Sequence, residues 1–328
     1  MKHSFTRTHN TKACFFQWEW LLVLVFILIH IINSIISPWY LSLDTFISTP
    51  MMFLDKAFIV FPMMLILLTG NIDISVSSIV ALSSVMMGVT YNAGVPMILA
   101  IVLCLITGTI CGFINGFLLI KFKELPAMII TLSTMTIYRG LAYIILEDQA
   151  AGKFPTWFKF FGWGYVGHIP FIMLIFAICA IFFGILIHKT TFGRAVYGIG
   201  NNMIASKYSG IKTDTVMLIV YILTGLMSGI TALFLTSRMG STRPNIAIGY
   251  ELEIIAMTVL GGVSTAGGQG RIAGPLLAIG IIGYLQYGLG LINISAQIVM
   301  IITGLLLIVS VMIQNIRFDA TRIISVKK

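Results

Sequence analysis

The sequence predicts an all-helical protein that crosses a membrane about ten times, because apolar runs of about 20 residues follow one another along the chain. Of its 328 residues, 58% are hydrophobic and only 9% are charged, and the mean hydropathy is +1.02. Soluble domains carry about a quarter of charged residues, so this chain lacks the polar coat of a water-exposed surface. Alternating segments of the kind that form membrane barrels do not occur, which favours helices.

Ten apolar segments account for the predicted spans. The first is flanked by Trp18, Trp20, Trp39 and Tyr40, and such aromatic side chains favour the membrane interface. We expect this segment to be retained, since residues 34–38 do not form a small-x-small cleavage site and further apolar segments follow. The predicted spans are 18–37, 51–70, 73–92, 96–120, 126–146, 169–187, 214–236, 247–262, 272–292 and 296–316.

The distribution of basic residues predicts the orientation of the chain. Most of the 20 Lys and Arg residues fall in the segments 1–17, 121–124, 188–212, 263–271 and 317–328. Because positive residues favour cytoplasmic loops, both terminal tails and the loop 188–212 are assigned to the cytoplasm, and the loop 147–168 to the outside. This bias explains the net charge of +9 without a nucleic-acid partner. The exceptions are Lys56, Arg139, Lys153, Lys159, Arg238 and Arg243.

A polar break at residues 69–78 separates two apolar runs and contains Asp73 and Ser75. An ionisable group within a membrane is costly, so Asp73 is a candidate for the translocation path. The alternative is that Asp73 or Asn71 caps the next helix. Both interpretations remain open for this segment.

Arg139 lies well inside the predicted span 126–146 and must therefore face protein or water. It is a candidate to contact a polar solute, or else to pair with Asp73, Glu251 or Glu253 and hold helices together. Glu251 and Glu253 are two residues apart and point to different faces of a helix, which argues against a paired-carboxylate catalytic site. Glu251 also suits the positive end of a helix dipole.

The glycine-rich segment 260–274 is not a phosphate-binding loop, because it lacks the required lysine and a preceding strand. Its glycines favour close helix approach and a tight turn. The cysteines form no CxxC pair, and His, Asp and Glu are not clustered. No metal site, cofactor or catalytic residue is therefore predicted. If ATP powers this protein, another chain must bind it.

Residues 203–209 are predicted to form a short helix in the loop 188–212. Asn201 or Asn202 can cap its start, and Gly210 can end it in the left-handed conformation. Its apolar residues stand beside Lys207, a composition suited to docking into a groove of a partner protein. The alternative is a helix that lies on lipid headgroups.

The chain resembles the permeases of bacterial sugar-type ATP-binding-cassette importers, the ribose, xylose, rhamnose and autoinducer-2 group. The matching segments occur in the family's order over nearly the whole chain. They are GNIDISVSS at 70–78, YRGL at 138–141, TFGR at 191–194, GIGN at 198–201, SGIK at 209–212, GYEL at 249–252, GGVS at 261–264 and GGQG at 267–270.

This resemblance implies a ten-helix fold of the vitamin-B12-permease type, called type II, in a bacterial cytoplasmic membrane. It implies three partners: a second permease copy, identical or different, a cytoplasmic ATPase, and an extracytoplasmic solute-binding protein. The ATPase would hydrolyse ATP, and the permease itself would not be an enzyme. The transmembrane domain would cover 18–316, between the tails 1–17 and 317–328. The residues that couple to the ATPase would be Arg194, Asn201, Ala205, Lys207 and Gly210.

Some positions depart from the family pattern. Ile204 and Ser206 replace the acid and the second alanine of the general permease signature, and Pro275 follows Gly274 where threonine is usual. Within the group, residues 18–20 and 55–62 are most similar to rhamnose-type permeases, with ribose and autoinducer-2 types as the alternatives. The competing hypothesis is an ion-coupled secondary transporter of a small polar solute. That mechanism needs buried ionisable or ion-coordinating groups, and the sequence offers little beyond Asp73 and Arg139.

Overall fold

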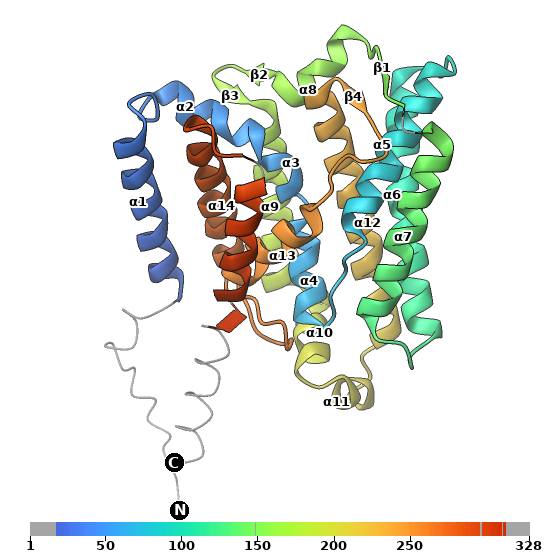
Figure 1. Ribbon diagram of the computed structural model, residues 1–328. Helices are drawn as coiled ribbons and strands as arrows, with labels where there is room; N and C mark the ends of the chain where they lie inside the picture. The colour runs from blue at the N-terminus through green and yellow to red at the C-terminus, as the bar shows by residue number, and fades with distance from the viewer. Residues whose placement is uncertain (1–17, 148, 296, 310, 313–328) are drawn as a thin grey trace, which may run out of the picture.

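The computed structural model describes residues 18–147, 149–295, 297–309 and 311–312, and this part of the chain is predominantly helical (Figure 1). Six of its helices are long and apolar enough to cross a membrane. The prediction of a helical, polytopic membrane protein is therefore confirmed. These helices are α1 (Trp18–Ile36), α6 (Met97–Lys121), α7 (Ala127–Leu146), α9 (Phe171–Lys189), α12 (Thr213–Met239) and α14 (Ala273–Leu291).

The segment predicted to span the membrane at 51–70 is bent and begins earlier than expected. The segment forms a bent pair, Leu43–Met52 and Leu54–Leu68, whose halves meet at 58°. Pro50 lies in the first turn of the short helix in the first half, and Asp55 and Lys56 in the second half are buried against partners on other helices. Charges within a membrane are costly without such partners. The pair comprises α2 (Leu43–Ser48), η2 (Thr49–Met52), α3 (Leu54–Ala57) and α4 (Val60–Leu68).

Two further predicted spans are shorter than expected. The helix predicted at 73–92 is α5 (Val76–Asn92), and residues 71–74 are not helical. The span predicted at 247–262 is α13 (Tyr250–Leu260), whose 11 residues fall short of the roughly 20 that cross a bilayer. Both helices begin deep in the molecule, away from either end (Figure 1).

The last predicted span, 296–316, is described only in part, as an apolar helix at Gln297–Val309. The remainder of that span lies outside the described residues, and so do the predicted tails 1–17 and 317–328.

The two ends of the molecule are built differently (Figure 1). One end, here called the α11 end, carries α10 (Thr191–Asn201) and α11 (Met203–Tyr208). The opposite end, the β4 end, carries two small antiparallel sheets and the short helices of the loop 147–168. The sheets pair β1 (Ala151–Gly152) with β4 (Ser241–Thr242) and β2 (Tyr165–Val166) with β3 (Ile169–Pro170), and the helices are η3 (Thr156–Phe158) and α8 (Lys159–Trp163).

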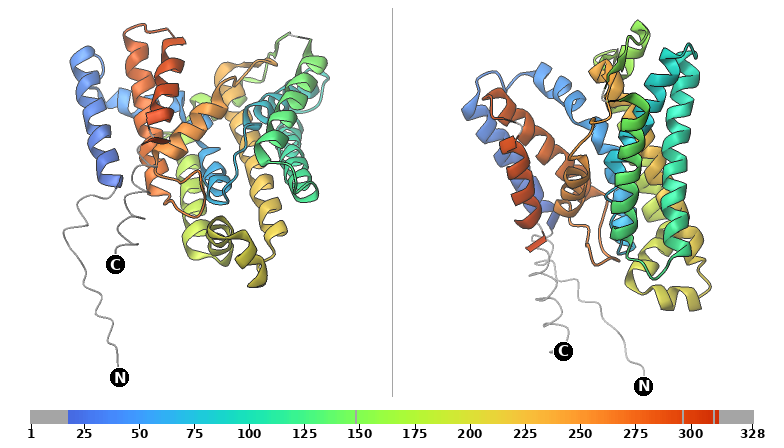
Figure 2. Two further views of the ribbon diagram at one scale, coloured as in Figure 1. Left: turned by 60° about the horizontal axis from the view of Figure 1, so that its bottom comes forward. Right: turned by 45° about the vertical axis from the view of Figure 1, so that its right-hand side comes forward.

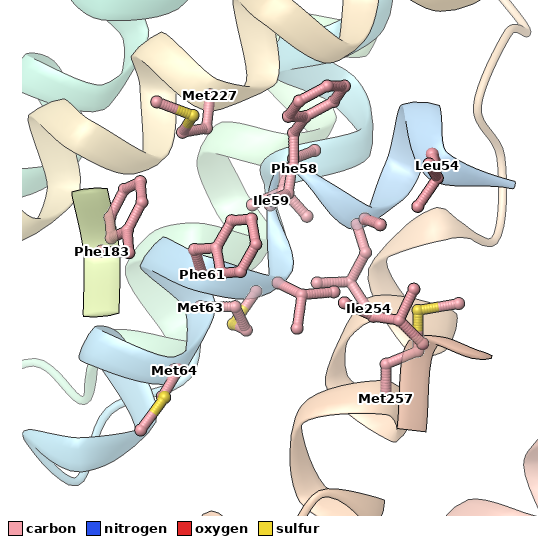
Figure 3. Packing of buried hydrophobic residues seen from close by; sticks show 14 of the residues in the cluster. Leu54, Phe58, Ile59, Phe61, Met63, Met64, Phe183, Met227, Ile254 and Met257 are labelled. Atoms are coloured by element: carbon pink, nitrogen blue, oxygen red, sulfur yellow. The ribbon is translucent and has the colours of Figure 1, made fainter. Parts of the chain in front are cut away.

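Helix α4 is at the centre of the hydrophobic core, and every one of its residues is buried. A helix that is apolar on all sides belongs in the interior. Phe61 stacks on Phe183 of α9, and Phe58, just before α4, stacks on Phe234 of α12 (Figure 3 shows Phe58, Phe61 and Phe183). Helix α1, in contrast, lies at the edge of the molecule beside α14 (Figure 2).

Helices α6 and α12 form the most extensive helix pair and approach each other through glycines. Gly108 and Gly112 of α6 face Gly225 and Gly229 of α12. A Cβ on Gly112 would lie 2.9 Å from the Gly225 Cα and would overlap the carbonyl oxygen of Tyr221. Small residues permit such close packing between membrane helices, so this pair forms a rigid part of the scaffold behind the site.

Candidate functional site

Arg139 lies at a pocket of about 360 Å³ between α5, α7 and α13. It is half-buried, and its Nη1 donates to the carbonyl oxygens of Pro244 at 2.6 Å and Ile246 at 2.8 Å. The guanidinium thus holds the connection between β4 and α13, and it forms no ion pair within the part of the chain that is described. Of the two alternatives, pairing with a carboxylate is not found among the described residues, and Nη1 is held by backbone carbonyls instead. We call this the Arg139 pocket; it is lined by Ser77, Ser78, Met135, Thr136, Arg139, Gly140, Tyr143, Ile248 and Glu251.

Glu251 and Glu253 point in different directions, as their spacing predicts. Glu251 lines the Arg139 pocket, and its Oε2 is buried without a hydrogen-bond partner among the described residues. Glu253 pairs instead with Lys56, whose Nζ also donates to the Oε1 of Gln286 at 2.9 Å. The two carboxylates therefore take part in separate structures, one in a pocket and one in an ion pair.

Asp73 and Ser75 lie in a buried hydrogen-bond network and line none of the described pockets. The Asp73 Oδ1 accepts from the backbone N of Ser75 at 2.8 Å and from its Oγ at 2.6 Å. Asn115 of α6 donates to the Ser75 Oγ at 2.7 Å, and the Tyr138 hydroxyl of α7 donates to Asn115 at 3.0 Å. This arrangement fixes the polar break before α5 to two neighbouring helices and favours a structural role for Asp73.

The buried charges of the bent pair were not identified as candidates from the sequence. Asp55 is fully buried, and its Oδ2 accepts from Arg238 Nη2 at 2.6 Å. Lys56, expected only as an external basic residue, pairs with Glu253. The available signal was two adjacent opposite charges within an apolar segment, which are costly in a membrane unless each has a partner.

The expected short helix of the loop 188–212 is present as α11. Asn202 is its cap, since its side chain accepts from the backbone N of Ala205 at 2.9 Å, whereas Asn201 donates to the Tyr197 carbonyl. Gly210 has φ +84°, and Ile211 N donates to Ser206 O, as in a Schellman motif. The five candidate coupling residues are all exposed at this end: Arg194, Asn201, Ala205, Lys207 and Gly210.

The exposed side of α11 is partly apolar. Met203, Ile204 and Tyr208 are 45%, 70% and 88% exposed, and Lys207 is exposed beside them. A short helix with apolar residues and a cation on a free face is suited to docking in a protein groove. The composition expected from the sequence is thus presented outward, at the end of the molecule (Figure 1).

Helix α10 joins α11 to the core through a backbone junction formed by Gly200, Gly268 and Leu68. Gly268 N donates to the Leu68 carbonyl at 2.8 Å, and a Cβ on Gly200 would overlap that same carbonyl. Tyr197 donates to the Gly270 carbonyl at 2.6 Å; burial raises the pKa of its hydroxyl, although Arg271 lowers it. The glycine-rich segment therefore serves the close approach that its composition predicts.

Fold and site together describe a multi-pass membrane protein with a pocket between α5, α7 and α13 and a partly apolar, exposed helix at one end. Residues 39–311 match the family described as "Branched-chain amino acid transport system / permease component". The chain belongs to this family, and the family prediction made from the sequence is confirmed.

Curated relatives cover nearly the whole chain. The Ribose import permease protein RbsC of Bacillus subtilis is 38% identical over 293 residues, 89% of this chain and 90% of the relative. The Autoinducer 2 import system permease protein LsrD of Yersinia enterocolitica is 33% identical over 307 residues, 92% of each. LsrD of Escherichia coli K12 is 32% identical over 314 residues, 94% of this chain and 95% of the relative. No solved structure matches the chain significantly.

Membership in this family has two consequences. The chain is a permease subunit of an importer and not an enzyme, and ATP is hydrolysed by a separate subunit. The family also implies a solute-binding protein as a partner. The multi-pass location in a cytoplasmic membrane is consistent with the six long apolar helices.

Proposed function

We propose that this chain is the permease subunit of an ATP-binding-cassette importer that carries a sugar or sugar-like solute. The observation that carries the proposal is the 38% identity to a ribose import permease over 89% of the chain. The Arg139 pocket supports it, because its hydroxyl, guanidinium and carboxylate groups suit a neutral, hydroxyl-rich solute. The named relatives favour a ribose or autoinducer-2 type of solute, and a rhamnose type remains a proposal from the sequence alone.

The assembly around this chain is part of the proposal. We expect ten spans of the vitamin-B12-permease type, two permease copies in one transporter, and both termini in the cytoplasm. The α11 end then faces the ATPase, with Arg194, Ala205, Lys207 and Gly210 among the contact residues. Asp73 and Ser75 would hold the helix break, while Arg139 and Glu251 would line the path. Lipid would cover apolar faces such as that of α1.

The experiment is uptake into proteoliposomes that contain the permease, its ATPase and its binding protein. We expect labelled sugar to enter when ATP is supplied and no ion gradient exists, and not to enter with a non-hydrolysable ATP analogue. Sugar uptake that follows a proton or sodium gradient without ATP would support the ion-coupled alternative instead. ATP-driven uptake of leucine without sugar uptake would refute the proposed solute class.

The proposed orientation is tested by labelling single cysteines in a background that lacks the four native ones. Trp157→Cys lies at the β4 end and Lys207→Cys at the α11 end, and both positions are exposed. We expect an impermeant maleimide added to intact cells to label position 157 only, and position 207 to react only in inside-out vesicles. The reverse pattern would invert the topology.

A further inference from the structure

We propose that the Arg139 pocket binds one face of a neutral, polyhydroxylated solute, and that the connection 243–249 is the wall between this pocket and a second one. The proposal rests on the proposed function and deepens it by placing the solute. It follows from four observations: two converging helix starts, unpartnered polar atoms, the donor groups of Arg139 and a strained connection shared by two pockets.

Two helix N-termini meet at the Arg139 pocket. Ser77 and Ser78 belong to the first turn of α5, and Glu251 to the first turn of α13. Both helices start deep in the molecule and not at a membrane surface (Figure 1). The N-terminus of a helix carries partial positive charge, and interrupted helices that start within the membrane are typical of solute sites in transporters.

Polar atoms at this pocket are left without partners by the described part of the chain. Ser78 is only 1% exposed, and its Oγ has no hydrogen bond there; neither has the Oε2 of Glu251. Buried polar atoms are nearly always satisfied in folded proteins. Both residues line the pocket, so a rotation of either side chain toward it would let a polar ligand satisfy these covered atoms.

The groups around the pocket match neighbouring hydroxyls on a sugar ring. A carboxylate such as Glu251 accepts from two O–H groups, and a guanidinium donates several N–H groups in a fixed plane. Arg139 uses Nη1 for the carbonyls of Pro244 and Ile246, so its other donors are available to the solute. The volume of 360 Å³ falls within the range of about 300–1,000 Å³ for small-molecule sites.

The connection 243–249 separates the Arg139 pocket from a second pocket of about 510 Å³. Ile248 lines both pockets, while Arg238, Arg243 and Asn245 line only the second, toward the β4 end. Ala247 has φ +61°, a strained conformation for a residue with a Cβ. Arg139 holds this strained connection, so one side chain both fixes the wall and faces the solute.

The first arm of the test measures protection of a cysteine in the pocket. Thr136→Cys is introduced into the cysteine-free permease, assembled with its ATPase and binding protein in membrane vesicles. We expect whichever of D-ribose, D-xylose, L-rhamnose and autoinducer-2 is taken up to slow the reaction of this thiol severalfold, and L-leucine to leave it unchanged. Trp157→Cys, which lies outside the pocket, serves as the control and should react equally with and without sugar.

The second arm measures uptake kinetics. With the binding protein saturated by sugar, Arg139→Gln and Glu251→Gln are each expected to lower the rate of ATP-driven uptake at least tenfold, and Glu124→Gln, exposed away from the pocket, to leave it unchanged. Recovery by size-exclusion chromatography identifies variants that fail to fold. If a variant fails to fold, the Thr136→Cys protection experiment alone tests the pocket assignment. If wild-type vesicles take up sugar with ATP, yet Thr136→Cys is unprotected, the pocket assignment is overturned while the proposed function stands. If the wild type takes up neither these sugars nor autoinducer-2, the proposed function itself fails.

Discussion

Replacing Gly112 with valine is expected to abolish the folded permease. Ordinary overpacking of a core costs about 1–3 kcal/mol, because side chains can rearrange. At Gly112 the obstructing atoms are the backbone of Tyr221 and Gly225, so α6 and α12 would have to separate along their whole contact. We expect the yield of monodisperse protein to fall at least about tenfold, since each 1.4 kcal/mol is a factor of ten.

The matched control is Gly184→Val. Gly184 lies inside α9 and has no neighbouring atom within 4 Å of an added Cβ, so the change has the same cost in helix propensity without the overlap. Size-exclusion chromatography and thermal unfolding of both variants provide the comparison. Equal recovery and equal midpoints would show that α6 and α12 do not need their glycines.

Replacing Gly210 with valine is expected to reduce both uptake and substrate-stimulated ATP hydrolysis while the protein still inserts and folds. Gly210 has φ +84° and nothing within 4 Å of an added Cβ, so the cost is purely one of backbone conformation, about 1–2 kcal/mol. The end of α11 would change direction, and in the proposed docking its exposed apolar face would no longer fit the ATPase. We expect substrate-stimulated ATP hydrolysis and uptake to fall together by about tenfold.

Gly94→Val is the control for this experiment. Gly94 has φ +92°, stands in open space, and closes α5 with the same pair of backbone hydrogen bonds, at the opposite end of the molecule. It thus carries the same strain away from the docking surface, and its uptake should stay near that of the wild type. Lys207→Glu tests the surface without backbone strain and should weaken coupling. Wild-type activity in both Gly210→Val and Lys207→Glu would favour a helix that lies on lipid headgroups.

The long helices could be predicted from hydropathy because lipid demands an apolar run of fixed length. The expected spans 96–120 and 126–146 correspond closely to α6 (Met97–Lys121) and α7 (Ala127–Leu146). The start and end of α11 were equally accessible, since an Asn cap and a left-handed glycine act within a few residues. Local chemistry was sufficient in both cases.

The bend near Phe53 and the partners of the buried charges could not be predicted in the same way. Asp55 and Lys56 are satisfied by Arg238 and Glu253, which lie more than 180 residues further along the chain. Arg139 donates hydrogen bonds to backbone carbonyls of the connection before α13. Every residue has a backbone carbonyl, so the sequence does not mark these acceptors. Such choices depend on which helices become neighbours, and hydropathy does not encode that.

The backbone junction of Gly200, Gly268 and Leu68 has a mechanical consequence. A contact made through long side chains transmits a displacement incompletely, because the side chains can change rotamer and absorb part of it. Here main chain meets main chain directly, so this joint has little compliance. A displacement of α10 by a partner on α11 would therefore reach α4, the innermost helix, nearly undiminished. Gly200→Ala would place a Cβ against the Leu68 carbonyl and should therefore force α10 and α4 apart at this junction.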